Sequence, residues 1–321
     1  MSLTSLGAQE PLDDSQLLLL PAGPGSQSAW RVGWTRFRRD PVALASLIVI
    51  GLLIVMAVLA PVLTAINGHP PDAEYQNHLD PLLGGLPSGS VGGVSGSFWF
   101  GLEPGTGRDL FSMIVYGARV SLFVSVSATI VTVVVATLMG ITAGFFGGWI
   151  DTIISRLMDL LLAFPSLIFM IALVAVLPSV PRLLLLIIIL SVFGWPYLGR
   201  IVRGETMSLR EREFVEAARA MGAPVRYTLL RELLPNLLTP IIVTSMLTVP
   251  TYITAEAGLS FLGLGIEPPT PSWGSMLANS LNWYATDPWY FIFPGFFLFL
   301  AVFSFNMAGD GLQRALDPRG D

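Results

Sequence analysis

Few side chains in this sequence have the chemistry of a catalytic or metal-binding group. The 321 residues include two histidines, His69 and His78, and no cysteine, which excludes thiolate metal sites, disulfides and cysteine nucleophiles. No His-Glu-x-x-His or Gly-x-Ser-x-Gly pattern is present. All 17 basic residues are arginine, so a phosphate-binding loop with its lysine cannot form. The residue types argue against an enzyme and against an ATPase, and they favour incidental loop polarity over metal ligation for the two histidines.

The charged residues also avoid the long apolar segments. Charged residues make up 12% of the chain and hydrophobic residues 53%, and the mean hydropathy is +0.69, values typical of an integral membrane protein. Secondary transporters and channels commonly carry ionisable groups at mid-membrane to bind coupling ions. The apolar segments lack such groups, so we expect the energy source for any transport to lie outside this chain.

Six apolar segments are long enough to cross a bilayer as helices, which takes about 20 residues each. They are residues 42–66, Val120–Ile150, Leu160–Pro181, Leu183–Gly199, Leu233–Ala255 and Pro288–Gly309. Two other uncharged runs, Pro81–Leu102 and Pro268–Thr286, are rich in glycine, serine or proline and are predicted loops. Pro165, Pro240 and Pro250 lie inside spans and indicate either kinks or ordinary packing geometry.

Four glycines close to the end of the second span have approximately the small-residue spacing that lets helices approach closely: Gly140, Gly144, Gly147 and Gly148. Two interpretations remain open from the sequence. The glycines mark either a contact with another subunit or only a tight turn before Asp151.

The positions of the arginines predict the orientation. Four arginines precede the first span, and seven lie at residues 200–232, between spans four and five. The positive-inside rule places both segments, and with them both termini, in the cytoplasm. The predicted organisation is a cytoplasmic tail (1–35, of which 1–29 is expected to be mobile), a first transmembrane helix (36–66), an external loop (67–115), a five-helix core (116–312) that contains a cytoplasmic loop (202–236), and a cytoplasmic tail (313–321).

The cytoplasmic loop contains a predicted short amphipathic helix. Its apolar stripe has helical spacing and consists of Phe214, Ala217, Ala218 and Met221. Gly222 is suited to end this helix, because glycine adopts a left-handed cap without steric cost. A second short helix is expected from about residue 225 towards Pro235. The pattern alone favours equally a helix that docks into a groove on another protein and a helix that lies on the membrane surface.

A family resemblance separates those two interpretations. Glu216-Ala217-Ala218-Arg219-Ala220-Met221-Gly222, followed by Pro235, resembles the EAA loop of ABC importer permeases. In that family the loop is a coupling helix that inserts into a cleft of the ATP-binding subunit. The resemblance implies that five residues couple this chain to an ATPase: Glu216, Ala217, Ala218, Gly222 and Pro235.

Further motifs resemble the C-type permease of dipeptide, oligopeptide and nickel importers, from about Arg36 to the end of the chain. They are Gly107-Arg108-Asp109-Leu110, Tyr116-Gly117-Ala118-Arg119-Val120-Ser121-Leu122, Gly147-Gly148-Trp149-Ile150-Asp151, the run Ala257–Gly265 with Pro268–Gly274, and Leu316-Asp317-Pro318-Arg319. The run Gly101–Asp109 departs from the family pattern, and Gly84–Gly96 reads as extra loop. Both departures concern the external contact with a solute-binding protein.

The resemblance implies an all-α integral membrane protein with six transmembrane helices and a cytoplasmic coupling helix, the type I ABC importer permease fold. The implied location is the bacterial cytoplasmic membrane. The implied partners are a homologous second permease, two ATP-binding subunits, an external solute-binding protein and membrane lipid, with no nucleic acid. ATP and Mg would bind the ATPase subunits, and no cofactor or metal is expected on this chain.

The resemblance also implies a function, namely the import of dipeptides or oligopeptides by alternating access. Import of nickel chelates or haem by the same architecture remains open, as does a less favoured ATP-independent secondary transporter. Arg119 and Glu256 are candidates for the substrate pathway or for an external contact. Each has a plainer interpretation, since Arg119 can snorkel to the interface and Glu256 can cap a helix or pair with a neighbouring subunit.

Overall fold

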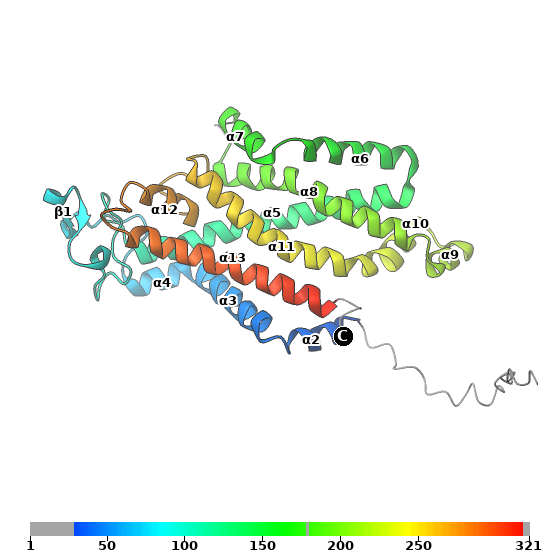
Figure 1. The fold of residues 1–321 in the computed structure, drawn as a ribbon, viewed down its shortest axis with the longest axis horizontal. Coiled ribbons are helices and arrows are strands. Elements are labelled where there is room, and N and C mark those ends of the chain that lie inside the picture. The colour runs from blue at the N-terminus through cyan, green and yellow to red at the C-terminus, as the bar shows by residue number, and fades with distance from the viewer. Residues whose placement is uncertain (1–28, 178–179, 317–321) are drawn as a thin grey trace, which may run out of the picture.

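The computed structural model describes residues 29–177 and 180–316, and the predicted mobile segment 1–29 lies almost entirely outside them. The described chain is an elongated bundle of helices roughly parallel to one long axis (Figure 1). Helix α9 (Glu213–Ala220) lies at one end of this axis, and the strands β1 (Leu79–Asp80) and β2 (Leu86–Pro87) belong to the other end. These are called the α9 end and the β1 end below.

Among the described residues five helices are long and apolar enough to cross a membrane, and the number equals the six predicted spans if one bent helix pair is counted as a single span. The long helices are α3 (Pro41–Val58), α5 (Leu110–Phe146), α8 (Arg182–Leu209), α11 (Leu234–Phe261) and α13 (Trp289–Leu316). The bent pair is α6 (Gly148–Ala163) with α7 (Ser166–Val176). The shorter helices are α2 (Ala29–Phe37), α4 (Ala60–Asn67), α10 (Val225–Tyr227) and α12 (Trp273–Ser280).

Proline accounts for two breaks in the predicted spans. The third span bends by 86° between α6 and α7, where Phe164 is extended just before Pro165, as expected because proline disfavours the helical conformation of the residue before it. The first span, predicted as one helix over 42–66, is divided at Leu59 into α3 and α4. Pro61 follows that break and lacks the N–H that would bond to the preceding turn.

The prediction that Pro268–Thr286 is only a loop is wrong, because part of this segment forms helix α12. Ser272 caps the helix by accepting a hydrogen bond from the Ser275 N–H at 3.1 Å, and the two serines form a capping box. The Trp273 side chain is completely buried, and its indole N–H donates to the Ile114 carbonyl at 3.1 Å. The cap and the buried indole stabilise this helix. A sequence criterion based on long apolar runs detects neither of them.

The four glycines near the end of the second predicted span have two different structural roles. Gly140 and Gly144 let α5 approach α8 closely, because a Cβ at Gly140 would lie 2.8 Å from the Gly199 carbonyl oxygen. The α5–α8 pair is the most extensive contact between helices of the chain. Gly147 and Gly148 have positive φ and form the turn into α6. The described contacts of these glycines are therefore internal, within one chain.

We expect Gly140→Val to destabilise the chain by about 1–3 kcal/mol, since added methyl groups would overpack the α5–α8 contact. Gly51→Val in α3 is the matched control, because no atom lies within 4 Å of a Cβ added there. Thermal unfolding in detergent should show a lower midpoint for the Gly140 variant only. Equal midpoints for the two variants would contradict the close-packing role.

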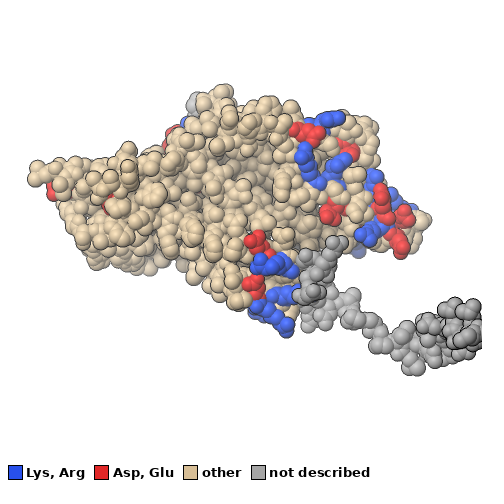
Figure 2. Space-filling model, in the orientation of Figure 1, with Lys and Arg blue, Asp and Glu red and all other residues tan. Residues whose placement is uncertain are grey.

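The charged side chains gather at the α9 end. Figure 2 shows arginines and acidic residues around α9, α10 and the region of α2, whereas the middle of the visible face carries almost no charge. Two ion pairs of this end join α8 to α6, Arg203 with Asp151 and Arg200 with Asp159. This distribution fits a bundle whose middle lies in hydrocarbon and whose α9 end lies in water.

Candidate functional site

Helix α9 presents two different faces at the α9 end. Val215 and Ala218 are buried, and Val215 joins the core cluster formed by α5, α6, α8 and α11. Phe214, Ala217 and Met221 are exposed, and Met221 reaches 82% exposure. Of the predicted apolar stripe only Ala218 is buried, and Val215, which is not part of the stripe, takes the position facing the bundle. Most of the stripe forms an apolar surface that the described chain does not cover.

Gly222 ends α9 as the sequence predicted. Its φ is +77°, its N–H donates to the Arg219 carbonyl, and the Ala223 N–H donates to the Ala218 carbonyl, both at 3.0 Å. This double bonding is the Schellman motif, which satisfies the last carbonyls of the helix and needs a left-handed residue. A Cβ at Gly222 would meet no atom within 4 Å, so conformation and not space demands glycine here.

Arg219 is exposed and joins α9 to α5. Its guanidinium carbon lies 4.9 Å from the ring centroid of Phe145, which is within the range of a cation–π contact. Together with the burial of Val215, this contact holds α9 against the long helices. A force applied to α9 would therefore reach α5 directly.

The segment after Gly222 differs from the predicted second short helix. Residues from Val225 to Phe261 form one continuous helical segment through α10, a π-helical stretch (Thr228–Leu233) and α11. Pro235 lies exposed in the first turn of α11, where its missing N–H is tolerated because the π-helical bonding displaces the usual partner. The segment after α9 is thus rigidly joined to a membrane-length helix.

The remaining residues with a predicted coupling role, Glu216 and Ala217, are exposed on α9, whereas Ala218 faces the core. Glu216, Ala217, Phe214 and Met221 are thus all accessible on α9 and at its C-terminal end. We call these four residues the α9 surface. Gly222 and Pro235 contribute to the shape of the segment.

The two candidates for the pathway lie in different environments. Glu256 on α11 is fully buried and accepts hydrogen bonds from the hydroxyls of Ser121, at 2.9 Å, and Ser260, at 2.8 Å. Arg119 is an exposed residue of α5. Glu256 thus ties α5 to α11 inside the bundle, and the structure does not bring it together with Arg119.

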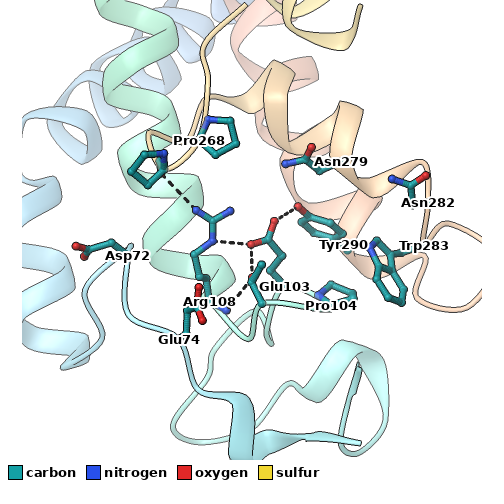
Figure 3. A pocket seen from close by; sticks show the side chains of 12 residues that line it. Asp72, Glu74, Glu103, Pro104, Arg108, Pro268, Asn279, Asn282, Trp283 and Tyr290 are labelled. Atoms are coloured by element: carbon teal, nitrogen blue, oxygen red, sulfur yellow. Dashed lines mark hydrogen bonds and ion pairs between the residues drawn. The ribbon is translucent and has the colours of Figure 1, made fainter. Parts of the chain in front are cut away.

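A polar cavity of about 490 Å³ opens at the β1 end (Figure 3). Its wall contains the buried ion pair of Arg108 and Glu103, whose nitrogen and oxygen lie 2.6 Å apart. The Tyr290 hydroxyl donates to Glu103, and Arg108 also donates to the Pro269 carbonyl at 3.3 Å. Burial works against the charged guanidinium, but the hydrogen bond and the charge of Glu103 outweigh it and raise the pKa of Arg108. This network joins the external loop to α13 and to the segment before α12.

The two histidines lie near this end and share an aromatic neighbour. His69 and His78 pack against Phe98, with ring centroids 4.6 Å and 5.1 Å apart. Over residues 29–177 and 180–316, no group of three or more His, Cys, Asp or Glu side chains is placed to hold a metal ion. The contacts of the histidines are those of loop packing.

Sequence comparison matches nearly the whole described chain. Residues 136–320 match the family described as binding-protein-dependent transport system inner membrane component, and residues 28–82 match the N-terminal transmembrane domain of oligopeptide transport permease C. The dipeptide transport system permease protein DppC of Alkalihalophilus pseudofirmus is 41% identical over 91% of this chain and 90% of its own length.

Two further relatives are named for different substrates. The oligopeptide transport system permease protein OppC of Bacillus subtilis is 38% identical and covers 92% of this chain and 91% of its own. The glutathione transport system permease protein GsiD of Shigella dysenteriae is 39% identical and covers 91% of each chain.

Among solved structures, an inward-facing form of the MetNI methionine ABC transporter is similar in fold. The TM-score is 0.51 at 20% identity, over 64% of this chain and 96% of that chain. At this identity the likeness concerns the arrangement of helices alone.

Proposed function

The chain belongs to the family of binding-protein-dependent transport inner membrane components, in its dipeptide and oligopeptide branch, and on that premise we propose that it imports peptides by ATP-driven alternating access. It has the type I importer permease fold, and as a permease subunit it is not an enzyme. The sequence resemblance to this family is thus confirmed.

The observation that carries the proposal is the construction of α9. A short helix closed by a Schellman motif presents Glu216, Ala217 and two apolar side chains, while its opposite face is anchored in the bundle. A lever transmits motion only if one side is free to engage a partner and the other is fixed. We assign the α9 surface to the cleft of an ATP-binding subunit, with Gly222 and Pro235 shaping the segment that positions it.

The arrangement implies an orientation and a set of partners. The α9 end, with its arginines, faces the cytoplasm, and the β1 end receives an external solute-binding protein. A homologous second permease completes the translocation pathway, and two ATP-binding subunits bind ATP and Mg. Closure of the ATPase pair pushes α9, and the Arg219–Phe145 contact carries the movement to α5.

Dipeptides and oligopeptides are the favoured substrates, because two of the relatives carry those names at 38–41% identity. Glutathione is the second candidate, since GsiD is similarly close in sequence and glutathione is itself a tripeptide. Both candidates present peptide groups, so the chemistry required of a binding surface is similar.

Purification of the tagged chain from its native membrane in mild detergent tests the assembly. Mass spectrometry should identify a second permease, ATP-binding subunits and a solute-binding protein in the same particle. Reconstituted into vesicles, that complex should take up dialanine or tetra-alanine only with ATP. A chain that purifies alone and transports without ATP would contradict the proposal and support a secondary transporter.

A further inference from the structure

Two hollows adjoin along one face of α11. One, of about 570 Å³, lies between α8, α11 and the last turns of α13, and the other, of about 240 Å³, lies between α7, α8 and α11. Gly194, Thr251 and Tyr252 line both, so the hollows meet at these residues. The lining positions on α11 run from Val243 to Ala255, which is about 18 Å of helix. We call the two hollows together the α11 groove.

The lining of the α11 groove combines apolar side chains, such as Leu247 and Phe193, with neutral polar ones. Thr244, Thr248 and Thr251 follow one face of α11, and Tyr197 on α8 stands 65% exposed beside them. No charged side chain of residues 29–177 and 180–316 lines either hollow. Thr248 and Thr251 donate to carbonyls of their own helix, at 2.8 Å and 3.1 Å, which leaves their oxygen lone pairs free to accept.

This surface differs from the rest of the bundle exterior. The exposed residues of α13 include Phe296, Phe299 and Phe303, and those of α5 include Val131 and Val134, as suits lipid contact. Thr248 and Thr251 donate within α11, yet their free lone pairs, together with the Tyr197 hydroxyl, can still bond to a polar molecule in the groove. The α11 groove is therefore suited to a polar occupant.

Tyr252 occupies the junction of the two hollows. Its hydroxyl lies 2.8 Å from the Thr132 hydroxyl on α5, and its ring lies over Gly194. A Cβ at Gly194 would come within 1.6 Å of the Tyr252 hydroxyl oxygen, so glycine is required for the ring to lie back against α8. Gly194 and Thr132 together hold the ring beside the junction and thereby set its width.

We propose that the α11 groove is this chain's half of the substrate path, that it binds the main chain of an extended peptide through neutral hydroxyls, and that Tyr252 sets its narrowest width. The inference rests on the proposed import of peptides and names the part of the chain that does it. An extended peptide rises about 3.3 Å per residue, so 18 Å of groove accommodates about five residues. Because the groove would bind peptide amides and has no charged side chain, its affinity should not depend on the peptide's side chains or on whether the peptide termini are free or blocked.

The absence of native cysteine makes cysteine labelling a clean test on this chain. Thr248→Cys and Thr251→Cys are near-isosteric, and Val134→Cys on α5, where the valine is 52% exposed and lines neither hollow, is the lipid-facing control. Each variant is purified in its full complex, without ATP, and treated with a charged methanethiosulfonate. The groove cysteines should react at least about tenfold faster than the control, since one unit of pKa elevation in hydrocarbon already lowers the thiolate fraction tenfold.

Tetra-alanine and N-acetyl-tetra-alanine amide should both protect the groove cysteines and leave the control unchanged. Labelling no faster than at Val134→Cys, or labelling that neither peptide slows, overturns the inference. Because protection needs no ATP, it tests the groove separately from ATP-driven uptake, which tests the proposed function.

The width of the junction is tested by Gly194→Ala, which pushes the tyrosine ring into the path, and by Tyr252→Ala, which removes it. When the uptake of the two peptides is compared within each reconstituted complex, Gly194→Ala should lower the uptake of tetra-alanine more than that of dialanine, and Tyr252→Ala should not. Equal uptake ratios in both variants and the parent would overturn the role of Tyr252.

Discussion

Replacing Gly222 by valine should abolish most ATP-coupled uptake while the subunit remains in its complex. A β-branched residue at φ +77° strains the Schellman turn, and a left-handed conformation costs an ordinary residue about 1–2 kcal/mol. Such a cost changes the population of the correctly shaped α9 roughly 5- to 30-fold. ATP hydrolysis and peptide uptake, measured together in vesicles, should show more ATP consumed per peptide imported.

Gly68→Val is the matched control for this experiment. Gly68 also has a φ of +77° and open space around its absent Cβ, but it ends α4 near the β1 end. Its replacement introduces a similar local strain without touching α9, so the ratio of ATP hydrolysed to peptide imported should stay at the parent value. Gly222→Asn should behave mildly, because asparagine tolerates the left-handed region. Normal uptake by the Gly222→Val complex would contradict the coupling role of α9.

Replacing Arg108 by methionine should have the largest effect on stability, about 3–5 kcal/mol of destabilisation. Glu103 is 3% exposed and would retain hydroxyl donors from Tyr290 and Thr106 but no opposite charge. The substitution would also release the Pro269 carbonyl and loosen the segment leading to α12. A clear drop in the thermal unfolding midpoint of the purified protein should report the loss.

Two controls distinguish the destabilisation caused by an unpaired buried charge from that caused by the loss of any arginine. Arg314→Met removes an exposed partner of Asp40 and should cost no more than about 1 kcal/mol, as surface ion pairs do. The double variant Glu103→Gln with Arg108→Met should recover part of the lost stability, because no charge is then left buried. A double variant as unstable as the sum of both single variants would contradict this explanation.

Much of the membrane architecture was predictable, because its causes are local in the sequence. Hydrocarbon tolerates few charges, so long uncharged runs marked the five helices of membrane length, and Pro165 marked the position of the 86° bend between α6 and α7. Gly222 was predictable for the same kind of reason, since a helix that ends in a left-handed turn favours glycine at that point. The α12 helix escaped prediction because its stability comes from a cap and from burial of Trp273 among distant residues.

Which face of a helix meets a partner depended on the tertiary structure. The apolar pattern in α9 did not distinguish Val215, which packs into the bundle, from Phe214 and Met221, which do not, because periodicity identifies apolar faces and not what covers them. The Glu103–Arg108–Tyr290 network and the Tyr252 junction join residues far apart in the chain, through contacts that exist only after the helices pack. The sequence by itself thus determined a multi-span permease with a glycine-capped helix α9, whereas the exposed face of that helix and the buried charges were decided by packing between distant segments.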